Sequence, residues 1–261
     1  MVAASADDKR ARDAGFGRSR TDVTENAPIE ADELPRKICQ FAALSPADRV
    51  LDVPCSDGAL VFEMAPSCGY AVGVDSSEAK IADAATRNVE EGLDNTSFQV
   101  GSAETLEFDD GTFDRVVCWD GLHHFAEPAL ALGELTRVLR SPGYLTVVDI
   151  DASEDRGWRE THDRIERSRD PGHGRLLTRV EVRELLEDRG LSIERERRWR
   201  VHRTFEEWME TITPDEGTLE RTHRMLTEAA RKKSTGLEIS VKGRNIDVIH
   251  RMAGWMALKI S

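Results

Sequence analysis

Two adjacent histidines, His123 and His124, are the side chains in this sequence best suited to moving a proton. They follow a short apolar run, and an imidazole in such a place can act as a general base near neutral pH or orient a second reactant. For each histidine the alternative is a structural role, such as a hydrogen bond to a loop carbonyl. We expect no metal here, because adjacent side chains point to different sides and no third ligand is evident.

Two acidic residues, Asp52 and Asp75, end two apolar segments. Asp52 is followed by the turn-forming run Pro54-Cys55-Ser56-Asp57-Gly58 and then by helical spacing. A strand, a sharp turn and a helix N-terminus therefore meet at a crevice where a ligand can bind. Asp75 lies about twenty residues later, where an acid can accept hydrogen bonds from a ribose diol. The alternatives are a capping acid at Asp52 and an ordinary strand-end acid at Asp75.

The segments that position these residues alternate between strand and helix patterns. Strands are expected near residues 49–53, 70–74, 96–100, 114–119 and 143–150. Helices are expected near residues 58–66, 77–91 and 128–140. Such alternation predicts an α/β fold, with a doubly wound, mostly parallel sheet between two layers of helices.

The pattern is looser beyond residue 151. Residues 151–171 are rich in Arg, Asp and Glu and suggest a mobile, partly helical connector. A helix over 178–189 has Thr178 as its N-cap, Glu181 three positions later and Gly190 as its end. Further elements are expected in chain order: a strand over 192–203, two helical segments over 205–233 and a last strand over about 249–260.

The first 45 residues are assigned to a separate N-terminal region. Residues 1–25 are polar and show little periodicity, so we expect a flexible segment or a flap that orders over a ligand. Apolar residues at helical spacing between Pro28 and Leu44 predict an amphipathic helix that covers the main domain, residues 46–261.

Composition narrows the classes of partner. The chain of 261 residues has a net charge of −13 and is 39% hydrophobic. We expect no nucleic-acid partner, because a phosphate backbone requires a basic surface. We expect no membrane partner, since no apolar run approaches the length of a span. No secretory signal is evident, and the four cysteines show no metal-ligand spacing, so a cytoplasmic protein with reduced thiols is predicted.

Five segments resemble, in the usual order, the motifs of the class I S-adenosylmethionine-dependent methyltransferases. The segments are Val50–Gly58, Val72–Asp75, Gly101–Val117, Leu122–Phe125 and Leu139–Leu145. The most similar subgroup is the small-molecule enzymes that resemble the ubiquinone and menaquinone biosynthesis methyltransferases. The resemblance implies a Rossmann-like, seven-stranded sheet with an antiparallel last strand. It also implies S-adenosyl-L-methionine as cofactor and a helical cap, residues 205–245, inserted over the mouth of the active site.

The resemblance assigns the methionine end of the cofactor to the first turn. Asp52 would organise the amino group, and Pro54, Cys55, Ser56 and Gly58 would contribute backbone atoms. Pro54 and Ser56 stand where the family usually has glycines. Cys55 is not expected to be a nucleophile, because no base is evident beside it.

The adenosine end is assigned to residues that follow the next strands. Asp75 and Ser76 would contact the ribose. Ser102, which stands in place of the family's usual acid, would lie along the edge of the adenine together with Ala103. The stem of Lys80 would cover the adenine, although a solvated helix face is the alternative. The backbone of Trp119 and Asp120 would complete the cofactor site.

The acceptor side is assigned to His123, His124 and the run Asp170-Pro171-Gly172-His173-Gly174-Arg175. His173 and Arg175 would face the acceptor, and Arg175 could hold a carboxylate. The alternative is that this run is only a turn whose glycines redirect the chain.

The function implied is methyl transfer to a small molecule, with a homodimer as an option. The alternative is a relative that binds the cofactor without methylating, as a cyclase, a rearrangement catalyst or a regulatory protein. Pro54 and Ser56 keep that alternative open. A nicotinamide-dependent dehydrogenase is disfavoured, because the full Gly-x-Gly-x-x-Gly pattern is missing.

Overall fold

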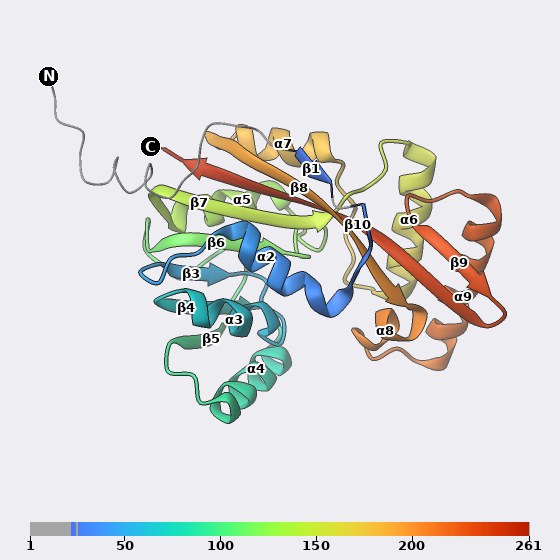
Figure 1. Cartoon of the computed structure of the whole chain (residues 1–261), viewed down its shortest axis with the longest axis horizontal. Helices are drawn as coiled ribbons and strands as arrows, with labels where there is room; N and C mark the ends of the chain where they lie inside the picture. The colour runs from blue at the N-terminus through green and yellow to red at the C-terminus, as the bar shows by residue number, and fades with distance from the viewer. Residues whose placement is uncertain (1–21, 25, 261) are drawn as a thin grey trace, which may run out of the picture.

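The computed structural model describes residues 22–24 and 26–260, which form a twisted sheet flanked by helices (Figure 1). The strands predicted in the first half of the chain are parallel neighbours in the order β5-β4-β3-β6-β7. Their bounds are β3 Arg49–Asp52, β4 Tyr70–Asp75, β5 Thr96–Val100, β6 Phe113–Trp119 and β7 Leu139–Ile150. The prediction of a mostly parallel α/β sheet is confirmed.

The strand order creates a crevice at the centre of the sheet. From β3 the chain moves outward through β4 to β5, and then returns to the other side of β3 with β6 and β7. Ligands bind to open α/β sheets where the order reverses, outside the carboxyl ends of the strands. The residues that follow β3, β4, β5 and β6 therefore meet at one place.

The connecting helices are α3 Ala59–Met64, α4 Glu78–Glu91 and α5 Pro128–Val138. Ser77 caps α4 by accepting a hydrogen bond from the Lys80 backbone N–H, and Gly92 ends it with φ +65°. We predicted that the third helix reaches residue 140 and the next strand begins at 143. The helix instead ends at Val138 and β7 begins at Leu139.

Two long antiparallel pairings complete the expected seven strands. β10, Asn245–Lys259, lies between β7 and β8, Leu191–Thr204, and is antiparallel to both. The described residues add three short strands to this core: β1 Asp22–Thr24, β2 Ile29–Glu30 and β9 Glu238–Lys242. The antiparallel last strand is confirmed, and ten strands in all share the sheet.

The N-terminal region differs in part from the prediction. Most of the predicted flexible segment lies outside the described residues, but residues 22–24 form β1, parallel to β8. The predicted helix over 28–44 is shorter and divides into β2, the 3₁₀ helix η1 Ala31–Glu33 and the α-helix α2 Leu34–Ala42. Leu34, Ile38 and Phe41 are buried, and the Phe41 ring packs edge-on against Trp199 of β8.

The connector after β7, expected to be mobile and partly helical, contains one regular helix, α6 Arg156–Arg169, which is longer than predicted. Asp155 caps this helix through the Trp158 backbone N–H. The buried face of α6 includes His162 and Glu166, so the helix has little of the apolar periodicity by which helices are found in sequence. The capping box of α7, Arg179–Glu187, is confirmed.

A small lobe lies beyond the carboxyl end of β7 (Figure 1). It contains α6, α8 Phe205–Glu210, α9 Glu216–Lys232, β9 and the first half of β10. Its apolar core is separate from the two that cover the sheet and comprises Ile165, Phe205, Trp208, Met209, Leu226, Ala229, Leu237, Ile246 and Val248. Across the described parts of the chain, no helix combines the length and apolar character needed to cross a bilayer.

Candidate active site

A cleft of about 190 Å³ opens at the carboxyl ends of β3, β4 and β5. The loop after β6 forms its opposite wall. The lining residues are Val53, Pro54, Asp75, Ser76, Gly101, Ser102, Ala103, Glu104, His124, Phe125 and Ala126. Four separate segments of the chain thus meet where the strand order predicts a ligand site.

Asp75 forms a fixed carboxylate on the cleft wall. It ends β4 and is buried, with one oxygen accepting a hydrogen bond from the Ser56 backbone N–H at 2.9 Å. The other oxygen accepts one from the Ser77 backbone N–H, also at 2.9 Å. Each carboxylate oxygen keeps a further lone pair for a ligand hydroxyl group.

Asp52 ends β3 beneath the same turn and is 1% exposed. Neither carboxylate oxygen has a hydrogen-bond partner among the described residues. Burial, and to a smaller extent the charge of Asp75, raises the pKa of the Asp52 carboxyl well above its usual value. Such a group is costly to bury alone, so Asp52 is suited to a polar partner brought by a ligand.

The turn after β3 has backbone conformations that favour glycine, although not all of the residues concerned are glycine. Ser56 adopts φ +52°, a conformation that glycine reaches at less cost, and Gly58 adopts φ +82°. A Cβ on Gly58 would lie 2.6 Å from the Phe98 ring, so only glycine fits there. The Pro54 ring packs so closely on Gly121 that a Cβ on Gly121 would lie 2.2 Å from it.

Cys55 is buried inside this turn. Its backbone N–H donates to the Val74 carbonyl at 2.8 Å. Burial raises the pKa of the Cys55 thiol far above its usual value, so the thiol stays protonated and inert.

The predicted adenine side of the site is the loop after β5, and its side chains accept hydrogen bonds from backbone N–H groups. The Ser102 hydroxyl accepts a hydrogen bond from the Glu104 backbone N–H at 3.2 Å. The Glu104 carboxylate in turn accepts one from the Glu127 backbone N–H at 3.0 Å. Ser76 lines the cleft, whereas the exposed Lys80 lies on α4 and does not.

His123 is a buried, charged histidine. Its Nδ1 lies 2.6 Å from Asp149 Oδ1, and Asp149 also accepts hydrogen bonds from the backbone N–H groups of Leu122 and Ile150. Burial alone would lower the pKa of His123, but the Asp149 carboxylate outweighs it and raises the pKa to about 9. A histidine that is already protonated at neutral pH cannot accept a proton there.

His124 has the opposite character and lines the cleft. Its Nδ1 lies 3.2 Å from the Gly172 carbonyl oxygen, which can only accept, so Nδ1 carries the proton and Nε2 keeps a free lone pair. Burial and the positive charge of His123 lower the pKa of His124. His124 is therefore a neutral imidazole at pH 7.

His173 and Arg175 do not line the cleft. His173 is 5% exposed, and its Nε2 lies 2.9 Å from Asp163 of α6. Arg175 forms an ion pair with Glu181 at 2.8 Å. The backbone N–H groups of Gly174 and Arg175 both donate to the His123 carbonyl, so this turn supports the loop that carries His123 and His124. Contact of His173 or Arg175 with an acceptor stays a prediction.

Trp119 ends β6 beside this loop, and Asp120 follows it. Asp120 adopts φ +53°, and its backbone N–H donates to the Val148 carbonyl. The Trp119 indole N–H is buried and has no partner among the described residues. Neither residue lines the cleft, and their contact with a cofactor stays a prediction.

The expectation of no metal at the paired histidines stays a prediction, although His123 has two acidic neighbours that could be ligands. Donor atoms of Asp120, His123 and Asp149 lie within 4.8 Å of one another. The 2.6 Å between His123 and Asp149 is nevertheless a short hydrogen bond. Two ligands of one zinc ion, each about 2 Å from it, would stand about 3.3 Å apart. We therefore interpret this group as a hydrogen-bonded ion pair.

Asp149 is the main residue that sequence reasoning missed. It interrupts the apolar run Val147-Val148-Asp149-Ile150 inside a predicted strand, and an acid in such a run needs a buried partner. An acid inside an apolar run was the sequence signal that could have identified Asp149. Glu104 and Phe125 also line the cleft and were not assigned there.

Comparison with known proteins places this site in a family. A family model described as a methyltransferase domain matches residues 44–190. The uncharacterized methyltransferase YcgJ of Bacillus subtilis is 30% identical over 161 residues, 62% of this chain and 64% of that protein. A demethylmenaquinone methyltransferase of Mycolicibacterium gilvum is 36% identical over 106 residues, 41% of this chain and 43% of that one. The chain thus aligns with less than two thirds of each relative.

Solved structures agree on the fold. The crystal structure of YcgJ from Bacillus subtilis superposes with a TM-score of 0.78 and 24% identity, covering 87% of this chain and 98% of that one. The [4+2]-cyclase SpnF superposes with a TM-score of 0.65 and 19% identity, covering 95% and 91%. At such identities the superpositions show the shared fold alone. The family match and the strand order together establish that this chain belongs to the class I S-adenosylmethionine-dependent methyltransferase family.

Proposed function

We propose that this protein transfers a methyl group from S-adenosyl-L-methionine to a small-molecule acceptor. The observation that carries the proposal is the placement of Asp75 on the cleft wall. Two backbone N–H groups fix its carboxylate there, one of them from the turn after β3. The family membership supports the same reading.

The residues around the cleft fit this cofactor. Asp75 would accept hydrogen bonds from the ribose hydroxyls, and the loop of Ser102 and Ala103 would border the adenine. The unpartnered Asp52 carboxyl and the turn at Ser56 would hold the amino-acid end. When bound, the cofactor supplies an activated methyl group on a sulfonium, so the protein mainly has to align the two reactants.

His124 would supply the one proton transfer that an O–H, N–H or S–H acceptor requires. Its Nε2 lone pair is free because Nδ1 donates to the Gly172 carbonyl. His123 would not accept the proton. Its ion pair with Asp149 holds it in place as a charged neighbour of His124. The charge of His123 helps keep His124 neutral and therefore able to accept a proton.

Replacing His124 by glutamine should lower kcat by about 100-fold or more while leaving the affinity for S-adenosylhomocysteine nearly unchanged. In the natural protein kcat should rise with pH as His124 loses its proton. Because its pKa lies below 6.5, kcat should level off by neutral pH. Steady-state rates from pH 5 to 9 would check this.

His223→Gln is the matched control for that experiment, because His223 is exposed on α9 and bonds only the Arg244 carbonyl and the Phe205 ring in the described structure. Its kcat should equal that of the natural protein. Full turnover by the His124 variant would reject the base assignment.

The natural turn sequence should bind S-adenosylhomocysteine saturably, with a dissociation constant in the micromolar range typical of metabolite sites. Ser56→Gly should change that affinity little, because the backbone N–H that holds Asp75 remains and glycine accepts the positive φ. Calorimetric titration of the natural protein, Ser56→Gly and Pro54→Gly would measure this. No binding by the natural protein, with binding restored in either variant, would mean a degenerate site and reject methyl transfer.

Acceptor screening is the direct test of the function. Demethylmenaquinone is a reasonable first acceptor, because a relative named for it aligns over part of the chain. Release of S-adenosylhomocysteine together with a mass gain of one methyl group on an acceptor would support the proposal. Cofactor binding with conversion of an acceptor but no methyl gain would favour the non-methylating alternative. A cytoplasmic location and a homodimer stay predictions, the latter measurable by light scattering.

A further inference from the structure

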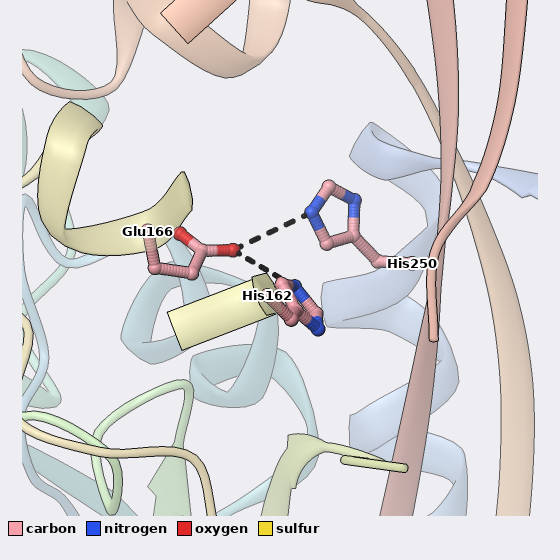
Figure 2. A group of neighbouring side chains, drawn as sticks. All are labelled: His162, Glu166 and His250. Carbon is pink, nitrogen blue, oxygen red and sulfur yellow. Dashed lines mark hydrogen bonds and ion pairs between the residues drawn. The ribbon is translucent and has the colours of Figure 1, made fainter. Parts of the chain in front are cut away.

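A second group of polar side chains lies outside the cleft, in the interior of the lobe. His162 and Glu166 stand one turn apart on α6, and His250 faces them from β10 (Figure 2). All three are almost fully buried, with exposed fractions of 3%, 2% and 1%. Two imidazoles and a carboxylate thus lie beside the apolar core of the lobe, with the centres of the His250 and Trp208 rings 5.1 Å apart.

Hydrogen bonds among these residues do not satisfy their polar atoms. Glu166 Oε1 lies 3.3 Å from His162 Nε2, but 3.8 Å from His250 Nε2, which is too far for a hydrogen bond. Both ring nitrogens of His250 are buried and have no hydrogen-bond partner among the described residues. Figure 2 shows the Glu166 carboxylate directed between the two rings. The unpartnered imidazole needs an occupant that the described protein atoms do not provide.

We propose that His162, Glu166 and His250 form a binding site for a divalent transition-metal ion, with Zn²⁺ as the expected occupant. One donor atom from each residue lies within 4.8 Å of the other two. Ligands about 2.0–2.1 Å from a tetrahedral zinc ion stand about 3.3 Å apart. The observed 3.3 and 3.8 Å are therefore close to the spacing that one shared ion would impose.

The surroundings of the three side chains suit a metal. Arg169 approaches the other Glu166 oxygen at 3.4 Å and orients the carboxylate. Two imidazoles and one carboxylate favour zinc, iron or nickel over Mg²⁺ and Ca²⁺, which prefer oxygen ligands.

The site would fasten α6 to β10 within the lobe. His250 lies on β10 just before its pairing with β7 begins at Met252, whereas both other ligands lie on α6. On α6, next to His162, Asp163 binds His173 of the turn that supports the loop of His123 and His124. A metal shared by α6 and β10 would therefore fix the helix from which that turn is held.

The first test is the metal content of the full-length protein, expressed without a polyhistidine tag and purified without chelator. Elemental analysis should find roughly one transition-metal ion per chain. X-ray absorption at the metal edge should show two imidazole ligands, and protein reconstituted with Co²⁺ should show visible d–d bands. These measurements use the natural sequence, so they decide the question even if a ligand variant fails to fold. A metal-free protein that takes up neither Zn²⁺ nor Co²⁺ after refolding with either ion would overturn the proposal.

The second test assigns the ion to these residues. His162→Gln and His250→Gln should each lose most of the bound metal, whereas the exposed control His223→Gln should keep it. His123→Gln should also keep it, because the group around Asp149 is a different site. Full metal content in the His162 and His250 variants, or loss only in the His123 variant, would overturn the assignment.

Discussion

Asp75→Ala should weaken the binding of S-adenosylhomocysteine by about 100-fold, which corresponds to about 3 kcal/mol. The substitution removes the charged acceptor for two ribose hydroxyls, and hydrogen bonds to charged groups are each worth about 1.5–3 kcal/mol. It also releases the backbone N–H groups of Ser56 and Ser77, so the turn after β3 loses one of the contacts that tie it to β4.

Asp57→Ala is the matched control, since Asp57 is an exposed acid in the same turn and, among the residues that the structure describes, accepts only a long hydrogen bond from Ala59, at 3.3 Å. Isothermal titration of both variants, with melting curves to confirm that each is folded, separates the ribose contact from a general loss of the turn. Unchanged affinity in a folded Asp75→Ala protein would place the ribose elsewhere.

The central sheet could be predicted from sequence because its signals are local. Every strand from β3 to β7 except β5 contains a run of apolar residues, and turns or caps such as Ser77, Gly92 and Pro128 mark the helix ends. The location of Asp52 and Asp75 at one site could be predicted as well, because both residues end strands and the carboxyl ends of parallel strands lie at the same edge of a sheet.

The errors arose where remote contacts determine the structure. β1 and β2 exist because β8 offers them an edge more than 150 residues later in the chain. Helix α6 has His162 and Glu166 on its buried face, where His250 of β10 lies beside them. No local pattern in residues 151–171 reports that partner.

The pair His123 and His124 illustrates the same limit within the site. In sequence the two imidazoles are equivalent candidates for a base. Their difference comes from Asp149, 26 residues later, and from the Gly172 carbonyl, 48 residues later. The first partner keeps His123 charged, and the second leaves His124 with a free lone pair. Only the fold brings either partner into contact.

Asp149→Asn should lower the free energy of unfolding by about 3–5 kcal/mol near pH 6, because it breaks a buried ion pair while leaving His123 buried. The amide can still accept from His123 Nδ1. However, its NH₂ group must then face the Leu122 backbone N–H. In the natural protein this N–H donates to Asp149 Oδ2 at 2.8 Å, so the variant would place two donors against each other. The half-exposed pair of Asp247 with His202, at 3.4 Å, is the matched control, and Asp247→Asn should cost about 1 kcal/mol or less.

The loss in the Asp149 variant should depend on pH with a definite sign. His123 has a pKa of about 9 in the folded protein, above its value of 6.5 in the unfolded chain. Its contribution to stability is therefore complete below pH 6.5 and is lost as the pH rises through 9. The pKa of Asp149 is lowered because the His123 charge and its hydrogen bonds outweigh burial, so its own contribution is lost only as the pH falls below 3.8. Urea unfolding at pH 6 and pH 9.5 should show the difference between natural protein and variant shrinking by about 3 kcal/mol at the higher pH. An equal difference at both pH values would mean that His123 is neutral in the fold, and the division of roles between the two histidines would then be wrong.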